Sequence, residues 1–117
     1  MINEKALELG RLIGQTEDHK ALKRAREALD EASEIRAQMQ RIEMLSDMIE
    51  QHVRERKEPP KEVTEEYEQL LASVQAHPRY QQVVAAQANF EKLMLKVNEH
   101  IMEGMKQGAE SPIIIPG

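Results

Sequence analysis

The chain has no cysteine and no tryptophan among its 117 residues, and it has one phenylalanine and two tyrosines. The absence of cysteine excludes disulfides, thiolate metal sites and a cysteine nucleophile within this chain. The shortage of aromatic residues argues against a β-sandwich, whose strands draw on aromatic and β-branched side chains. The missing residue types therefore disfavour a β-sheet fold and exclude thiol chemistry within this chain.

Long apolar runs are missing as well. No uninterrupted run approaches the roughly 20 apolar residues that a membrane-spanning helix needs. The first ten residues, MINEKALELG, carry acidic side chains and no continuous apolar region, which is unlike a signal or transit peptide. We therefore expect a cytoplasmic protein that does not contact a membrane.

Aliphatic and charged residues dominate what remains. Hydrophobic residues make up 40% of the chain, charged residues 32%, and the net charge is -5. This composition is typical of long solvated helices and predicts an all-α helical bundle. The acidic balance argues against binding nucleic acid over a broad surface. One helical domain over residues 1–108 and an extended C-terminal tail over 109–117 are predicted.

Apolar spacing and turn signals predict five helical segments. Thr16 is the expected N-cap of the second, the register shifts at residues 30–33, and Pro59-Pro60 must end the third. At Pro78 the pattern leaves two alternatives, a new helix capped by His77 or a kink in a continuous one. The segments cover residues 3–15, 17 to about 30, 35–57, 62–76 and 78–105.

The fifth segment carries the longest apolar seam in the chain. We expect it to pack with the fourth against the segment 35–57 as a long antiparallel hairpin, beside short N-terminal helices. Further apolar positions widen the face beyond a two-helix seam, so a homo-oligomer, most simply a symmetric dimer, is predicted. The seam consists of Val83, Gln87, Phe90, Met94, Val97 and Ile101, and the surplus of Met44, Leu45, Met48, Leu93, Leu95 and Met102.

The search for catalytic or metal-binding patterns finds none of the known spacings. No Glu-x-x-His or His-Glu-x-x-His motif occurs. His52 and His100 could meet across a hairpin, but two ligands make a poor metal site, and solvated histidines are the better interpretation. The paired carboxylates Glu17-Asp18 and Glu65-Glu66 fall in first helical turns, where they offset the helix dipole. We predict no enzymatic activity, no cofactor, no metal and no small-molecule substrate.

One basic cluster lies in the second segment. Lys20, Lys23 and Arg24 share a helix face that could contact a phosphate backbone. Acidic residues follow at once and aromatic residues for base stacking are lacking, so direct nucleic-acid binding is disfavoured. An RNA-binding accessory protein that uses this patch is kept as the alternative function.

The pattern Ala86-Gln87-x-x-Phe90-x-x-Leu93-x-x-x-Val97-Asn98-x-x-Ile101, with the order and length of the helices before it, resembles the YlbF/YmcA family of small helical bacterial proteins. The family also includes YheA-like members, and the resemblance covers nearly the whole chain. It implies an all-helical, often oligomeric fold without intrinsic enzymatic activity. It also implies a cytoplasmic regulator that binds an unrelated protein, affects competence, sporulation and biofilm formation, and assists messenger RNA processing. The C-terminal cysteine cluster implicated in iron-sulfur binding in some members is absent here.

The sequence therefore predicts a non-enzymatic helical adaptor that binds a protein partner through apolar anchors. A tail of three adjacent isoleucines is expected to contribute, as an extended strand or by filling a pocket of the partner. The candidate interaction residues are Leu93, Met94, Leu95, Ile101, Met102, Ile113, Ile114 and Ile115.

Overall fold

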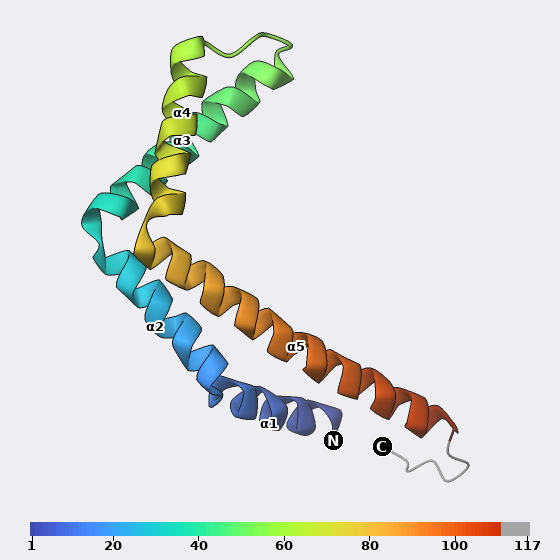
Figure 1. Ribbon diagram of the computed structural model, residues 1–117. Coiled ribbons are helices and arrows are strands. Elements are labelled where there is room, and N and C mark those ends of the chain that lie inside the picture. The colour runs from blue at the N-terminus through green and yellow to red at the C-terminus, as the bar shows by residue number, and fades with distance from the viewer. Residues whose placement is uncertain (111–117) are drawn as a thin grey trace. The chain divides into compact units, whose positions relative to one another are not determined.

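The computed structural model describes residues 1–110, and within them the chain forms five α-helices and no strand (Figure 1). The predicted all-α class is confirmed. The last helix continues to Glu110, a little over one turn beyond the predicted end, while residues 111–117 lie outside the described part. The helices are α1 (Ile2–Gly14), α2 (Glu17–Glu31), α3 (Ser33–Arg54), α4 (Lys61–Ala76) and α5 (Pro78–Glu110).

Thr16 separates α1 from α2 and contacts both. Its Oγ1 accepts a hydrogen bond from the backbone N–H of His19 at 3.2 Å, which is the predicted N-cap of α2. The same hydroxyl donates to the carbonyl of Ile13 at 2.7 Å, at the end of α1. One side chain therefore satisfies a backbone group on each side of the junction.

His77 and Pro78 separate α4 from α5. His77 is extended, with φ -72° and ψ 129°, and its Nδ1 accepts a hydrogen bond from the backbone N–H of Arg79 at 3.1 Å. Pro78 is the first residue of α5, a position where the missing N–H costs nothing. Of the two alternatives at this point, the capped new helix is the one that the structure contains.

The turn between α3 and α4 begins before the two prolines. The N–H of Lys57 donates to the carbonyl of His52 at 2.8 Å, and the N–H of Arg56 donates to that of Val53 at 3.0 Å. This is the Schellman pattern, which requires a left-handed residue, and Arg56 takes that role with φ +56°. The helix therefore ends at Arg54, earlier than predicted, because the cap closes it before Pro59-Pro60 do.

The described residues divide into two compact units, residues 25–84 and residues 1–24 together with those from 85 onward. In the unit 25–84, α3 and α4 lie side by side (Figure 1). Its apolar cluster joins α2, α3 and α4 with the start of α5, and the guanidinium of Arg79 also donates to the carbonyl of Ala28 at 2.7 Å. The cluster consists of Leu29, Ile35 and Val74, with Ala32, Ile42, Tyr80 and Val83 packed against it.

The buried face of α3 includes Leu45. Ile35 and Leu45 are both 1% exposed, whereas Met39 and Val53 are exposed. The assignment of Leu45 to the surplus surface was wrong. Leu45 falls on the same side of the helix as Ile35 and Ile42, and α4 covers that side.

In the other unit, the seam of α5 faces α1 and the beginning of α2. The ring of Phe90 meets the ring of His19 edge to face, with centroids 5.6 Å apart and planes at 65°. Further along α5, Ile101 lines a groove with Met1 and Ile2 at the start of α1. The prediction that Phe90 packs against the segment 35–57 was therefore wrong. Its partner is His19, because α4 already lies on α3.

Candidate functional site

The predicted interaction residues on α5 fall into two groups. Leu93 and Met94 are half-buried, so they contribute to packing within the unit. Leu95, Ile101 and Met102 are exposed, at 61%, 44% and 67%. The predicted contribution of Ile113, Ile114 and Ile115 lies outside the described residues. The exposed members of the set are therefore available for contact on the isolated chain, whereas Leu93 and Met94 are partly covered by their own unit.

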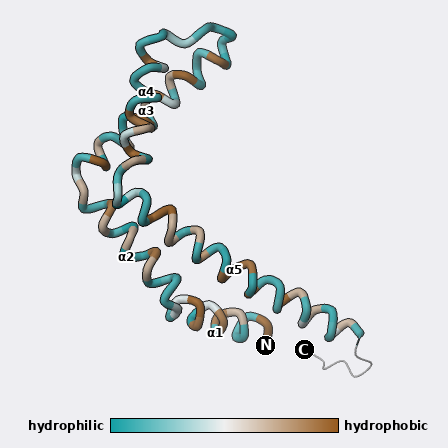
Figure 2. Tube along the Cα trace, viewed as in Figure 1, coloured by the Kyte–Doolittle hydropathy of each residue, from teal (hydrophilic) through white to brown (hydrophobic). Residues whose placement is uncertain are grey.

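Further exposed apolar residues lie on α1, which was not singled out as an interaction element. Figure 2 shows hydrophobic segments along this helix. The signal was present in the sequence, because Leu7 and Leu12 lie off the stripe formed by Ile2, Ala6, Leu9 and Ile13, of which Leu9 and Ile13 are half-buried. We call the exposed residues Met1, Ile2, Leu7 and Leu12 of the N-terminal segment the α1 surface.

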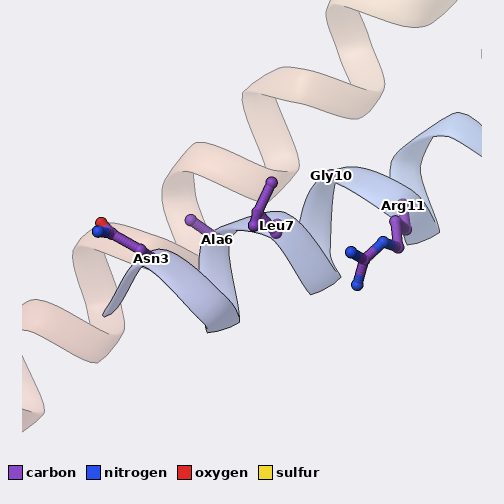
Figure 3. A pocket seen from close by; sticks show the side chains of 5 residues that line it. All are labelled: Asn3, Ala6, Leu7, Gly10 and Arg11. Atoms are coloured by element: carbon purple, nitrogen blue, oxygen red, sulfur yellow. The ribbon is translucent and has the colours of Figure 1, made fainter. Parts of the chain in front are cut away.

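Two shallow grooves adjoin the α1 surface. One, of about 470 Å³, lies between α1 and Ile101 and has Glu4 and Lys5 among its lining residues. The other, of about 700 Å³, runs along α1 itself (Figure 3). A Cβ added at Gly10 would meet no atom within 4 Å, so this second groove is open space. Its lining residues are Asn3, Ala6, Leu7, Gly10 and Arg11.

The predicted basic patch lies on the exposed side of α2. Lys20, Lys23 and Arg24 are all exposed, as expected for a helix face in water. The guanidinium of Arg24 lies 3.6 Å from the carboxylate of Glu17, which offsets one of the three positive charges. The net positive charge of the patch is thus lower than its three basic residues alone would give.

One carboxylate of the pairs noted in the sequence has a shifted pKa. Hydrogen bonds from Arg41 lower the pKa of Glu66 from its ordinary value. Desolvation opposes this lowering less strongly, and the positive charge of Arg41 makes the smallest contribution, which is again a lowering. The same contact raises the pKa of Arg41. Glu65 instead pairs with Lys61 one turn away at 3.7 Å. The Arg41–Glu66 contact joins α3 to α4, and the Lys61–Glu65 pair lies on the surface of α4.

The histidines considered as metal ligands contact their own helices. Nδ1 of His52 lies 2.8 Å from the carbonyl of Met48, and Nδ1 of His100 lies 3.9 Å from Glu103. No group of three potential ligands in residues 1–110 is placed to hold a metal ion. Across the same residues, no helix has both the length and the apolar character needed to cross a membrane.

A comparison with protein families finds a match that extends over residues 2–106. The matching family is described as control of competence regulator ComK, YlbF/YmcA. No curated protein and no solved structure matches the chain significantly. The match includes all of α1 to α4 and most of α5, that is, both compact units. The resemblance read from the α5 pattern is thereby confirmed, and this chain belongs to the YlbF/YmcA family of regulators.

Proposed function

We propose that this chain is a non-enzymatic cytoplasmic adaptor that exerts its regulatory effect by binding a partner protein through the α1 surface. The regulatory part follows the description of the family as control of competence regulator ComK. The binding mode is our own inference. A helix of the partner would lay its apolar face along α1, with its side chains entering the two grooves.

The observation that carries the proposal is the exposure of large apolar side chains along α1. No residue of this 13-residue helix is buried, although it is strongly amphipathic in sequence. Leu7 and Leu12 are exposed outside the stripe that faces α5. Large apolar side chains that stay exposed along one helix are typical of a contact region for another protein. Glu4 and Lys5 at the groove would supply a polar rim.

The test uses a substitution that blocks the groove without weakening the helix. Gly10→Leu places a side chain in the open groove shown in Figure 3, where a Cβ meets nothing within 4 Å. Leucine is also the better helix former, by roughly 0.7 kcal/mol, so α1 should become more stable. Any loss of binding therefore comes from the blocked groove. Ala72→Leu, at an exposed position of α4, is the matched control.

The tagged wild-type and variant chains are purified from the host together with the proteins that they retain. The binding of each protein retained by the wild type is then measured with purified components. We expect Gly10→Leu and Ile101→Glu each to raise the dissociation constant of the complex with the partner at least tenfold. A tenfold change corresponds to the loss of one modest apolar contact. Ala72→Leu should bind like the wild type. Equal binding by all four chains would refute the proposed surface.

A further inference from the structure

The seam of α5 continues beyond the groove that Ile101 lines with the start of α1, and Figure 1 shows α5 extending past that start. At 3.6 residues per turn, Gly104, Met105 and Gly108 all fall within about 60° of Ile101 around the helix. Ile101 is 44% exposed and Met105 is 69% exposed. A Cβ added at either glycine would meet no atom within 4 Å. We call these four residues the terminal seam, an apolar face that stays exposed in the part of the chain that the structure describes.

The seven residues after α5, which lie outside the described part, have the composition that such a face accepts. Their sequence, SPIIIPG, contains three isoleucines and no charged side chain. Ser111 and Ile115 each precede a proline, which favours an extended backbone at both positions, and β-branched isoleucine favours the same. Because side chains alternate along an extended chain, we expect Ile113 and Ile115 on one face of this tail and Ile114 on the other.

The tail is long enough to reach the terminal seam of its own chain. The helix α5 ends at Glu110, and at a rise of 1.5 Å per residue Met105 lies about 7.5 Å and Ile101 about 13.5 Å back along the axis. An extended chain advances about 3.3 Å per residue, so Ile115 can return about 10 Å even if two residues are spent on reversing direction. That distance brings Ile115 past Met105 and toward the groove.

The short tether also makes a weak contact sufficient. A segment tied to its site by a few residues has an effective concentration on the order of millimolar there. An isoleucine pair on an exposed methionine and a groove edge therefore competes well with a partner that is present at a lower concentration. Neither the terminal seam nor the tail carries a charged side chain, so the contact leaves no charge buried.

We propose that residues 112–116 fold back along the terminal seam and place Ile113 and Ile115 against Met105 and the Ile101 end of the groove. The tail thereby covers one of the two grooves assigned above to the partner. Its regulatory consequence, which rests on the proposed function, is competition. The apparent affinity for the partner falls by the fraction of chains whose groove is open.

The contact can be measured on the full chain without a partner, because the chain has no tryptophan of its own. Ile115→Trp places a single indole on the contacting face of the tail. We expect its emission at shorter wavelengths, and its quenching by acrylamide slower, than in the urea-unfolded chain. Met105→Glu in this background should reverse both effects, because it puts a charge on the terminal seam. Gln107→Glu adds the same charge about 160° around the helix from Met105 and is the matched control.

Several results of this measurement would overturn the proposal. One is an emission of the Ile115→Trp chain that is the same in buffer as in urea. Another is an equal response to Met105→Glu and Gln107→Glu, since the tail would then have no preferred face of α5. A third is protection that appears only as the protein concentration rises, because the tail would then contact a second chain.

Occupation of the groove can be measured with anilinonaphthalene sulfonate, a dye that fluoresces on exposed apolar surface. If the tail covers the groove in two thirds of the chains, Ile115→Ser should lower the dissociation constant of the dye about threefold. Ile114→Ser, on the other face of the tail, should bind the dye like the wild type. Adding Ile101→Glu to Ile115→Ser should remove the gain. Equal dye binding by the Ile115→Ser and wild-type chains would contradict the proposal.

The same two serine variants test the competition with the purified protein that the wild type retains. Ile115→Ser should lower its dissociation constant about threefold, and Ile114→Ser should leave it unchanged. Weaker binding by Ile115→Ser would overturn the competition and assign the tail to the partner contact. The tryptophan and dye measurements contain no partner. A failure of the α1 surface, seen with Gly10→Leu, is therefore distinguishable from a failure of the tail contact.

Discussion

Arg41 on α3 and Glu66 on α4 join the two helices through a forked ion pair. Nη2 of Arg41 lies 2.8 Å from Oε1 of Glu66, and Nε lies 3.0 Å from Oε2. Two parallel contacts fix the relative position of the side chains as well as their charge, which a lysine could not do. The pair therefore sets the register between α3 and α4 at the surface, beside the buried Leu45.

The stability contributed by this pair should depend on pH with a defined sign. Because Arg41 lowers the pKa of Glu66 in the folded state, the contribution is fully present above the ordinary pKa of about 4.5. It is lost as the pH falls through the lower pKa of the folded state. Glu66→Gln should thus lower the urea midpoint near neutral pH, and the difference from wild type should shrink toward about pH 2.

Glu68→Gln is the matched control for that measurement. Glu68 lies in the middle of α4, two residues after Glu66, and is exposed. Its removal should leave the midpoint nearly unchanged at every pH, since an exposed charge without a fixed geometry contributes little. A Glu66→Gln effect of constant size from neutral to acid pH would contradict the ion-pair explanation.

Truncation of two neighbouring residues on α3 should change the stability of the protein by very different amounts. Leu45 is 1% exposed against α4, so Leu45→Ala should lower the free energy of unfolding by about 2 to 5 kcal/mol. Met44 is 57% exposed, and Met44→Ala should change it by no more than about 0.5 kcal/mol. Denaturant unfolding of both variants measures the contrast. Comparable losses of unfolding free energy for the two variants would contradict the assignment of Leu45, and not Met44, to the buried face of α3.

Local signals in this sequence were sufficient to predict where α2 and α5 begin. Thr16 caps α2 through its hydroxyl, and His77 caps α5, whose first residue is Pro78. These caps can be predicted from the sequence because each depends on residues within one helical turn. The third helix ends before the predicted residue, since the left-handed conformation of Arg56 has no sequence signal as clear as a glycine.

The pairing of helices could not be read from the seams alone. Apolar spacing shows that Phe90 faces a helix, but α2 and α3 both offer suitable stripes. The helix lengths are informative here, because the 16 residues of α4 leave only six of the 22 residues of α3 uncovered, whereas Phe90 comes 12 residues after Pro78, the first residue of α5. The α1 surface does not follow from the apolar stripe of this helix, because Leu7 and Leu12 are exposed and lie outside that stripe.

The Thr16 junction offers a test of capping energetics. Thr16→Ala removes the oxygen that accepts from the N–H of His19, so α2 begins with an unsatisfied donor. We expect a loss of about 1 kcal/mol in the free energy of unfolding. Thr16→Ser keeps the hydroxyl and should recover most of it. If the serine variant is as unstable as the alanine variant, the methyl group of Thr16 rather than its hydroxyl is responsible.

The left-handed residue after α3 should make a stabilising substitution possible. Arg56 has φ +56°, a conformation that costs an ordinary side chain roughly 1 to 2 kcal/mol and costs glycine almost nothing. Glycine also loses more backbone entropy on folding, so the net gain of Arg56→Gly should be about 0.5 to 1 kcal/mol. Arg56→Ala keeps the strained conformation and removes the same charge, so its stability should match the wild type. A thermal or urea midpoint that rises for glycine and not for alanine would assign the gain to the backbone. A rise for both would assign it to the removed charge instead.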